Sequence, residues 1–477
     1  MPYHLESVDL MIRQMPPDRM SFAIGGVAPK RRPRAIVVIR VQVADDRGKS
    51  SWGVAADRPS FGWLDKRKSH SPDEMLTRLF ELVRASRKIY MREAKFESPF
   101  ALWANCWPQI MQVAKQMDHE SLSASFASAL LERAVIDAVC RLSDLTLFES
   151  IQRKKLGFSP QQIHPMLGDF PWRRFLPERP RTRFHIRHTV GLTDPIDSTD
   201  LKRDRRVNDG EPETLQEYVR RDGLRYFKVK ISGDPVKDLA RLGKIWGQLV
   251  RINEPIVTLD GNESYRDIDK FAKFVETFER EQLGMYQHTL FIEQPLTRAV
   301  TLDPSTQKTI RQISERKPLV IDEADGTTNS FARAFKIGYN GVSHKNCKGF
   351  FKSLANFCLC AFFNEQGKAA FQTGEDLSNM PLVAIQQDFT ALGLLKIDHC
   401  ERNGHHDGFG LSHLSAAEKE QALQIHGDLY IKRGNEAFLN IRGGQIECRS
   451  LQTAGFGVAF EPAWDQLVPL DDWEYTW

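Results

Sequence analysis

Several features that would place a protein in a special class are missing from this sequence. It contains seven cysteines, an odd number, and no CxxC pair, which argues against a disulfide framework and against a thiolate metal site. It has no run of about 18 apolar residues and no signal-peptide core near its start, so we expect a soluble, cytoplasmic protein. The formal net charge is only +4 over 477 residues, which gives no argument for nucleic acid or a membrane surface as partner.

Two local features of the sequence resemble a metal site and a basic binding segment, and each has an ordinary structural explanation. Cys358 and Cys360 lie two residues apart in an apolar helical stretch and therefore face different directions, which is poor geometry for a metal site. The basic run KRRPR, residues 30–34, is typical of a solvated loop, with contact to an anionic partner as the alternative. We therefore expect buried, reduced thiols and neither nucleic acid nor membrane as partner.

The first third of the chain has strands followed by helices. RAIVVIRVQVADDRGKSSWGVAA, residues 34–56, predicts two β-strands joined by a polar turn. From residue 71 to about residue 151 the apolar spacing is helical, and SLSASFASALLERAVIDAVCRLSDL is the clearest helix. This segregation predicts an α+β domain over residues 1–158. Residues 159–182, rich in Pro, Trp and Arg, predict an inserted loop or linker.

After residue 182 short apolar strands alternate with amphipathic helices. The strands are RFHIRHTVG, YFKVKISG, IVTLDGNE, LFIEQPL, LVIDEAD, GVSHKNCKG, AAFQTGED and LKIDHCERNG. Eight such strands close a parallel α/β barrel, whose active site lies at the carboxyl ends of the strands. We expect the barrel to span residues 183–430, and residues 431–477 to form a β-rich segment that returns to the N-terminal domain.

Chemically active side chains recur at about the interval of one barrel unit. Intervals of 30, 33, 29, 23 and 30 positions separate Lys230, Asp260, Glu293, Asp322, Lys345 and Glu375. Three of these are carboxylates at successive strand ends, and convergent carboxylates repel one another unless a cation lies between them. A hard divalent ion bound by Asp260, Glu293 and Asp322 resolves that repulsion, and we expect Mg²⁺, with Mn²⁺ as the alternative.

The strand YFKVKISG carries two lysines in an otherwise apolar segment. Side chains of a barrel strand alternate between helix layer and lumen, so the apolar row should face the helices, and Lys228 and Lys230 should face the lumen. Lys345 would then approach the metal from the opposite side. A partly desolvated lysine beside another cation has a lowered pKa and can serve as a base near neutral pH. A metal flanked by two such bases indicates abstraction of a proton α to a carboxylate.

Taken in order, these motifs resemble those of the enolase superfamily, specifically its muconate-lactonizing-enzyme-like branch. The matching motifs are KVK (228–230), LDGNES (259–264), IEQPL (292–296), IDEAD (321–325) and SHKNCKG (343–349). ERAVIDAVCRLSDLTLFESIQ, residues 132–152, resembles the last helix of the family's capping domain. The resemblance implies a modified TIM barrel, (β/α)7β-like, with an N-terminal α+β capping domain, and it implies a homo-oligomer.

Carried over position by position, the resemblance assigns roles to individual residues. The implied Mg²⁺ ligands are Asp260, Glu293 and Asp322. Glu323 competes with Asp322 for the third position. The resemblance makes Lys230 one catalytic acid/base and Lys345 the other. It makes Lys228 the group that neutralises a substrate carboxylate oxygen and lowers the pKa of Lys230.

Further positions concern the substrate. The candidates near the ends of the last two strands, with loop salt bridges as the alternative, are Glu375, Asp376 and Glu401. Dipeptide epimerases of this branch carry a DxD pair on the eighth strand, and its absence from IDHCERNG argues against a dipeptide substrate. In this family two cap loops set specificity, and here they fall near residues 20–33 and 57–64. Phe22 is a candidate substrate contact there together with Phe61 and Trp63, and aromatic packing inside the cap is the alternative for all three.

The sequence thus predicts a Mg²⁺-dependent enzyme that removes the α-proton of a small-molecule carboxylate. A racemase or epimerase is the leading interpretation, because two opposed lysines allow removal of the α-proton on one face of the substrate and return of a proton on the other. Cycloisomerisation and acid-sugar dehydration share the same half-reaction and stay open. From another class, a catalytically inactive barrel acting as a binding protein is the alternative, and metal titration distinguishes it. A phosphate-binding barrel enzyme would need a glycine-rich phosphate loop, for which GHHDGFG, residues 404–410, is a weak match.

Overall fold

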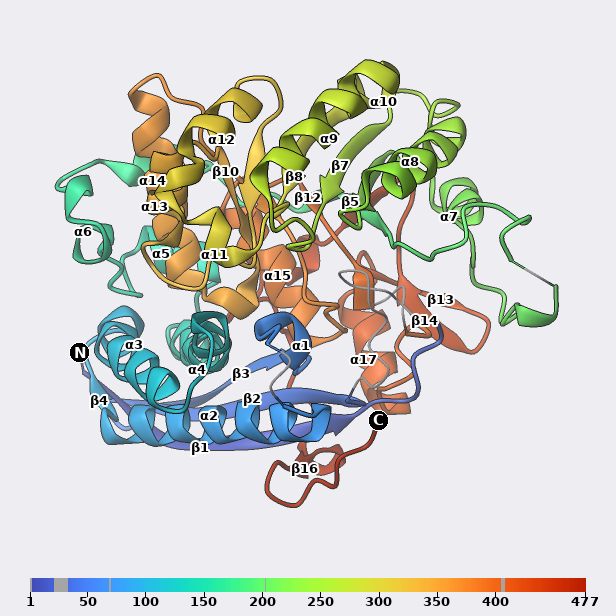
Figure 1. Ribbon diagram of the computed structural model, residues 1–477. Coiled ribbons are helices and arrows are strands. Elements are labelled where there is room, and N and C mark those ends of the chain that lie inside the picture. The colour runs from blue at the N-terminus through green and yellow to red at the C-terminus, as the bar shows by residue number, and fades with distance from the viewer. Residues whose placement is uncertain (1, 21–32, 68–69, 202, 405–407) are drawn as a thin grey trace.

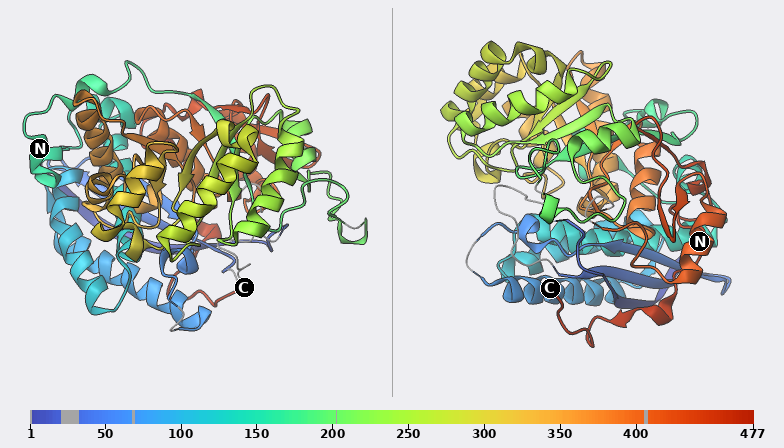
Figure 2. Two further views of the ribbon diagram at one scale, coloured as in Figure 1. Left: turned by 45° about the horizontal axis from the view of Figure 1, so that its top comes forward. Right: turned by 90° about the vertical axis from the view of Figure 1, so that its right-hand side faces the viewer.

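The computed structural model describes the chain except residues 1, 21–32, 68–69, 202 and 405–407. The elements form two units, a cap around an antiparallel sheet and a barrel around a parallel one (Figure 1). In Figure 1 the cap lies below the barrel, and helix α1 (Phe61–Leu64) lies between the cap sheet and the barrel. The two units stay one above the other when the molecule is turned about the vertical axis (Figure 2, right).

The cap sheet has the strand order β16–β1–β2–β3, with β4 also paired to β1, and its ladders are antiparallel. Its strands are β1 (Tyr3–Gln14), β2 (Ala35–Asp45), β3 (Ser50–Asp57), β4 (Lys95–Phe96) and β16 (Val468–Pro469). The helices of the cap are α2 (Pro72–Arg92), α3 (Pro99–Gln116), α4 (Ser121–Leu142) and α5 (Leu147–Gln152). The two strands predicted within residues 34–56 are β2 and β3, and the predicted long helix is α4.

Helix α4 is the centre of the cap because it has no polar face. Its residues are apolar or small nearly all the way round, and almost all of them are buried. Gly53 of β3 permits close approach of the helix, since a Cβ atom there would lie 2.1 Å from the carbonyl oxygen of Ala134. On its other side, Glu132 accepts a hydrogen bond of 2.5 Å from the amide of Phe351, in the first turn of a barrel helix. Helix α4 therefore joins the cap sheet to the barrel.

The segment expected to be an inserted loop, residues 159–182, is compact. It contains α6 (Pro160–Ile163), η1 (Pro165–Leu167) and η2 (Trp172–Phe175). The ring of Trp172 packs edge-on against Phe158, with centroids 5.2 Å apart, and Phe170 packs against Phe362 of a barrel helix, with centroids 5.4 Å apart. These aromatic contacts hold the segment against the outside of the barrel.

The barrel has the eight strands that the sequence predicts. They are β5 (Arg183–Val190), β6 (Tyr226–Lys230), β7 (Ile256–Asp260), β8 (Thr289–Glu293), β9 (Leu319–Ile321), β10 (Gly341–His344), β11 (Phe371–Gly374) and β12 (His399–Cys400). Neighbouring strands pair in parallel in the order β11–β10–β9–β8–β7–β6–β5–β12. Every strand therefore ends at the same rim, which is the rim that faces the cap.

Helices alternate with these strands and surround them (Figure 2, left). They are α7 (Leu215–Asp222), α8 (Pro235–Leu249), α9 (Ile268–Glu281), α10 (Leu283–His288), α11 (Arg298–Thr301), α12 (Gln307–Ser314), α13 (Ser330–Ile337), α14 (Phe350–Glu365), α15 (Val383–Leu394) and α17 (Ala416–Ile425). Short 3₁₀ turns are η3 (Arg203–Arg205), η4 (Pro304–Thr306) and η5 (Asn346–Lys348). The apolar row of β6, including Phe227 and Val229, is fully buried against this helix layer.

The barrel closes through contacts rather than through a ladder. Among the described residues, β11 and β12 share no strand pairing. They nevertheless approach closely at Gly374, where a Cβ atom would lie 2.4 Å from the carbonyl oxygen of His399. Arg187 of β5 reaches across the same seam and donates to Thr373 Oγ1 at 3.0 Å and to the Gly374 carbonyl at 2.8 Å.

The segment after the barrel contacts both units. It contains the hairpin β13 (Tyr430–Arg433) and β14 (Glu436–Leu439), β15 (Gln445–Glu447), η6 (Arg449–Leu451), η7 (Trp464–Gln466) and β16. Strand β15 pairs antiparallel with β5 of the barrel, whereas β16 pairs antiparallel with β1 of the cap. The segment expected to return to the N-terminal domain thus adds one strand to each sheet.

None of the helices in the described part of the chain is long and apolar enough to cross a membrane. All seven cysteines are buried and free. Burial raises the pKa of Cys106 and of Cys140 to about 12, so these thiols are unreactive near neutral pH.

The substitution Gly374→Ala tests the seam of the barrel. Because the new Cβ would lie 2.4 Å from a backbone oxygen, the strands must move apart, and we expect the free energy of unfolding to fall by about 1–3 kcal/mol. Gly247→Ala is the matched control: Gly247 lies inside α8 with open space around the Cβ position, so we expect a gain of about 0.5–1 kcal/mol. Urea denaturation measures both, and equal stability of the two variants contradicts the close approach of β11 and β12.

Candidate active site

The carboxyl ends of the barrel strands bring together nearly all of the residues singled out from the sequence. Asp260 ends β7, Glu293 ends β8 and Asp322 follows β9, and all three side chains are fully buried. The lysines of the group are Lys228 and Lys230 of β6 and Lys345, directly after β10. Since β6 and β10 are the second and sixth barrel strands, the two sets of lysines approach the carboxylates from opposite sides of the lumen.

Lys228 lies at the centre of the carboxylates. Its Nζ is 2.9 Å from Asp260 Oδ2, from Glu293 Oε2 and from Glu401 Oε1, and it also forms an ion pair with Glu375. Burial alone would lower the pKa of Lys228, but the carboxylates outweigh burial and hold this pKa well above its ordinary value. One ammonium ion is thus shared by acids that end, or directly follow, four different strands.

Arg187 of β5 supplies a second buried cation that the sequence analysis did not single out. Its guanidinium forms an ion pair with Glu375 and lies 3.8 Å from Glu401. The signal was present in the sequence, because Arg187 and Thr189 alternate with the apolar residues of RFHIRHTVG. Thr189 lies opposite Lys228 in the ladder between the two strands. The alternation that predicted a lumen-facing Lys228 therefore predicts a lumen-facing Arg187 as well.

Lys230 is held at the rim by the turn that follows β7. Its Nζ donates to Asp260 Oδ2 at 2.5 Å and to Asn262 Oδ1 at 2.6 Å. Asn262 takes a left-handed backbone conformation, with φ of 42°, which asparagine adopts more readily than most residues. Its amide nitrogen donates to Asp260 Oδ1 at 2.8 Å, and its side chain donates to Glu323 at 3.0 Å. The motif LDGN thus fixes both the carboxylate and the lysine.

Asp322 is bound by cations on both of its carboxylate oxygens. Lys345 donates to Oδ2 at 2.6 Å, while Lys348 at 3.0 Å and the Ser343 hydroxyl at 2.5 Å donate to Oδ1. Lys348 is fully buried and also donates to Ser343 Oγ at 2.7 Å. The second lysine of SHKNCKG, Lys348, has no role assigned in the sequence analysis, and it fixes the orientation of Asp322.

The pKa of Lys345 differs from the sequence expectation, which was that a neighbouring cation lowers it. Burial does act to lower the pKa of Lys345, but Asp322 outweighs it and raises this pKa above its ordinary value. The same ion pair, together with Lys348, holds the pKa of Asp322 well below its usual range against the effect of burial. The reason is geometric, because Lys345 lies 2.6 Å from Asp322 and this direct ion pair outweighs the repulsion from Lys228.

The donor chemistry of the acids fits a hard divalent cation. Glu293 Oε2 is buried and accepts no hydrogen bond, and burial, Asp260 and Glu375 raise the pKa of Glu293 well above its usual range. Lys228, 2.9 Å from this oxygen, therefore compensates the charge of the carboxylate only in part. In the described part of the chain, however, no three Asp, Glu, His or Cys side chains are grouped so as to hold a metal ion. Lys228 lies between Asp260 and Glu293, so a metal and this ammonium compete for the same oxygens.

A short segment of the cap covers this rim of the barrel. We call residues 61–67 the cover segment. The ring of Trp63 lies over the Lys345 ammonium, with Nζ 4.3 Å from the ring centroid, and the indole is almost fully buried. Lys66 donates to the Asn262 carbonyl at 2.7 Å and to Glu323 at 3.1 Å. Trp63, which sequence reasoning left between substrate contact and packing, thus touches a catalytic candidate directly.

Arg298, the first residue of α11, holds the same cover segment. Its guanidinium donates to the carbonyl oxygens of Leu64 at 3.0 Å and of Trp63 at 3.3 Å. A 2.9 Å ion pair with Glu263 orients Arg298, and Glu263 also pairs with Lys66 at 3.0 Å. The cover segment is therefore bound to two barrel loops by charge-assisted hydrogen bonds.

The remaining candidates for substrate contact lie at the ends of β11 and β12. Asn403 donates to Asp376 Oδ1 at 2.8 Å and to Glu401 Oε2 at 3.1 Å, which joins the two acids. Burial, followed by the charge of Glu401, raises the pKa of Asp376 to about 7. Glu375 is committed to Lys228 and Arg187, as described above. Phe22 lies outside the described residues.

Comparisons with known proteins show which solved structures this chain resembles. No protein-family model matches the chain, and no curated protein matches it. Among solved structures, a mandelate racemase/muconate lactonizing protein from Herpetosiphon aurantiacus shares 15% identity at a TM-score of 0.59, covering 96% of this chain and 99% of that one. The 2-chloromuconate cycloisomerase from Rhodococcus opacus 1CP shares 14% identity at a TM-score of 0.57, covering 97% and 98%.

A third solved structure is a dipeptide epimerase from Enterococcus faecalis V583 in complex with Mg and the dipeptide L-Leu-L-Tyr. It shares 12% identity at a TM-score of 0.57, covering 96% of this chain and 99% of that chain. All three similarities extend over nearly the whole of both chains. The chain therefore has the capped-barrel fold of the mandelate racemase and muconate lactonizing enzyme proteins, and the fold predicted from the motifs is confirmed.

Replacement of Lys228 by Met tests the charge balance of the lumen. Four carboxylates would lose their shared cation, and we expect the metal-free protein to lose about 3–5 kcal/mol of unfolding free energy at pH 8. Lys237→Met is the control, because that lysine is exposed and water screens its surface ion pair with Asp234, so we expect no measurable loss.

The loss should depend on pH with a defined sign. The raised pKa of Lys228 keeps its contribution constant between pH 5 and 8, both well below the ordinary pKa of lysine of about 10.4. In the variant the unpaired carboxylates have raised pKa values, so the folded state takes up protons and regains stability as the pH falls. Urea unfolding at pH 8 and pH 5 should show a smaller difference from wild type at pH 5. A difference that stays constant or grows would contradict this account.

Proposed function

We propose that this protein is a Mg²⁺-dependent enzyme of the enolase superfamily that abstracts the α-proton of a small-molecule carboxylate. Racemisation or epimerisation is the reaction that the site supports best. The observation that carries the proposal is the placement of Lys230 and Lys345 on opposite sides of one buried group of carboxylates, with Nζ atoms 2.5 Å and 2.6 Å from Asp260 and Asp322.

Each side chain then has a defined task. Lys230 takes the proton from one face of the substrate's α-carbon, and Lys345 returns a proton to the other face. A bound Mg²⁺ would be held by Asp260, Glu293 and Asp322 and would neutralise charge on the carboxylates and on the enediolate of the substrate.

Neighbouring groups position these residues. Lys348 and Ser343 fix Asp322, while Trp63 restricts the position of the Lys345 ammonium and excludes water from it. Lys228 keeps Glu375 and Glu401 paired, which departs from the free substrate-binding cation expected from the sequence. Asp376, joined to Glu401 through Asn403, is the acid we assign to substrate contact.

Two of the solved structures with the same fold support this reaction class. One of them is an epimerase and another is a cycloisomerase. Both reactions, and the dehydration of acid sugars, can begin with removal of an α-proton. Two opposed lysines favour racemisation or epimerisation, because cycloisomerisation needs no base on the second face.

Exchange of the α-proton in D₂O tests the roles of the two lysines. Lys230→Ala and Lys345→Ala should each lower turnover of a racemised carboxylate by about 10²–10⁴-fold, the usual contribution of a general acid/base. Starting from one enantiomer, each variant should lose exchange on one face only. NMR of the α-proton measures the exchange, with Lys237→Ala as the exposed control. Full activity in both lumen variants would sink the proposed mechanism.

Titration with MgCl₂ tests the ligands without any substrate. Glu293→Gln should weaken Mg²⁺ binding by at least about tenfold, because it removes the negative charge of a carboxylate whose Oε2 accepts no hydrogen bond. Asp322→Asn should weaken binding more than Glu323→Gln if Asp322 is the third ligand. Isothermal calorimetry measures each affinity, with the exposed Asp269→Asn on α9 as control. Absence of Mg²⁺ binding by the wild type would favour an inactive barrel that serves as a binding protein.

A further inference from the structure

The loop after β9 carries a second buried acid, three residues beyond Asp322. The amide nitrogen of Asp325 donates to the Asp322 carbonyl at 3.0 Å, so the two acids belong to one tight turn. In the described part of the chain, Asp325 Oδ1 has no hydrogen-bond partner, and both ion pairs of this carboxylate go to Oδ2. Asp325 therefore depends on a few neighbours for its positive charge.

Two fully buried lysines supply that charge. Lys348 Nζ lies 3.0 Å from Asp322 Oδ1 and 3.5 Å from Asp325 Oδ2. Lys352, in the first turn of α14, lies 2.7 Å from Asp325 Oδ2 and also donates to the Asp325 carbonyl oxygen. Since Lys345 binds the other oxygen of Asp322, the five side chains form a line of alternating charges that leads outward from the catalytic lumen.

Lys352 is unfavourable where it lies. A positive charge in the first turn of a helix opposes the helix dipole. Burial lowers the pKa of Lys352, and Asp325 offsets only part of this effect. Among the described residues, Asp325 is the one carboxylate within ion-pair distance of its ammonium. A buried ion pair is weak evidence for stability, so its role is better sought in the position of the groups around it.

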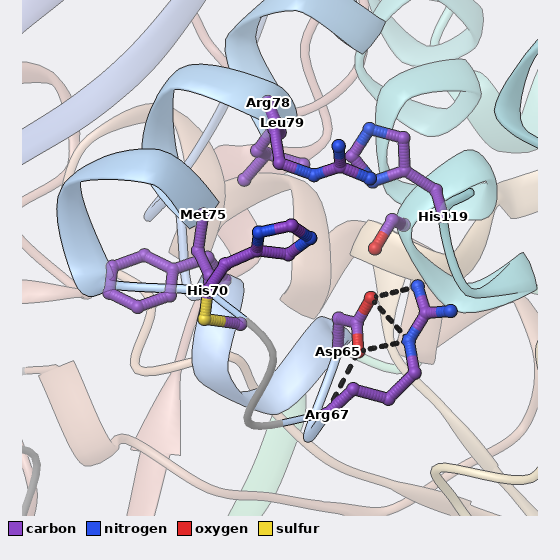
Figure 3. Close-up of a pocket in the computed structure, with 9 residues that line it drawn as sticks. Asp65, Arg67, His70, Met75, Arg78, Leu79 and His119 are labelled. Atoms are coloured by element: carbon purple, nitrogen blue, oxygen red, sulfur yellow. Dashed lines mark hydrogen bonds and ion pairs between the residues drawn. The ribbon is translucent and has the colours of Figure 1, made fainter. Parts of the chain in front are cut away.

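The cap contains an ion pair of the opposite kind. Figure 3 shows Asp65 and Arg67 in contact beside a hollow of the cap. Their closest atoms are 2.6 Å apart, but 38% of the Arg67 side chain is exposed. Water can therefore replace either partner of that pair, whereas no water competes for Lys352 or Asp325, and the loss of one must be met by a neighbouring side chain.

Lys348 is that neighbour, because both acids of the turn can bind it. With Lys352 in place, Asp325 is neutralised and Lys348 stays with Asp322. Without Lys352, the unpaired charge of Asp325 would draw Lys348 away, and Asp322 Oδ1 would keep only the Ser343 hydroxyl. We propose that Lys352 is a positioning residue, which occupies Asp325 so that Lys348 holds Asp322 in the orientation that binds a divalent cation. This inference rests on the proposed function, in which Asp322 is a metal ligand.

Calorimetric titration with MgCl₂ at pH 8 tests Lys352 by the sign of the effect. Lys352→Met should weaken Mg²⁺ binding by about tenfold or more, the usual result when a group that orients a metal ligand is lost. Electrostatics alone predicts the opposite, because loss of a buried positive charge favours a cation. Lys317→Met is the matched control, since this buried lysine donates to the Tyr286 carbonyl at 2.7 Å at the other end of β9. Unchanged or tighter binding by Lys352→Met overturns the proposal.

A double variant separates position from damage to the fold. Adding Asp325→Asn to Lys352→Met removes the charge that attracts Lys348, so Mg²⁺ affinity should return to within about threefold of wild type. Lys352→Gln, which keeps a donor for the Asp325 carbonyl, is a second single variant and should show the same loss as Lys352→Met. Melting temperatures confirm that each variant is folded. A double variant that binds as weakly as Lys352→Met overturns the proposal.

Crystal structures of the wild type and Lys352→Met in EDTA test the mechanism without metal or turnover. Lys348 Nζ should lie nearer Asp322 in the wild type and nearer Asp325 in the variant. An ammonium that stays on Asp322 Oδ1 in the variant overturns the proposal. If the wild type binds no Mg²⁺, the proposed function fails, and the position of Lys348 in these structures still decides whether Lys352 holds it in place.

Discussion

Charge balance inside a closed lumen is the constraint on which this site depends. Acids from four strands converge where water is excluded, and mutual repulsion there is much stronger than at a surface. Lys228 meets this constraint by contacting all four at once, and Arg187 supports Glu375 and Glu401 from the first strand. The apolar layer around them keeps the strand ends in place, so the positions of the charges follow from barrel geometry. The catalytic candidates are the members of this network that lie nearest the rim.

The cap takes part in the same balance. Lys66 brings a positive charge from the cover segment to Glu323 and Glu263, and Arg298 returns the contact from the barrel side. The cover segment is therefore held over the rim of the barrel by ion pairs as well as by packing. Trp63 adds an aromatic face over Lys345 that water cannot replace. The cap and barrel thus form one site, although they are separate units in sequence and in architecture.

Sequence reasoning reached the fold because period-two alternation and strand-end acids are local signals. It reached the lumen-facing placement of Lys228 and Lys230 for the same reason. It could not reach the partners of Lys228, because Glu375 and Glu401 meet it only after the barrel has closed. It also predicted a lowered pKa for Lys345, whereas contact with Asp322 raises it, since sequence shows which charges are near but not which ones touch. Arg187 lay within reach of the alternation argument, whereas the contact between Trp63 and Lys345 depends on how the cap docks.

The two late strands have a consequence for biosynthesis. Ile446 pairs with Phe184 at the barrel's first strand, and Met11 at the cap's first strand pairs with Pro469. A nascent chain on the ribosome therefore holds both sheets with an unpaired edge until residues 445–469 have emerged. Such edges invite pairing with other chains, and contacts so distant in sequence form slowly. Truncation before residue 445 should thus expose two unpaired strand edges at once, and docking of residues 445–469 becomes the step that commits the molecule to its native topology.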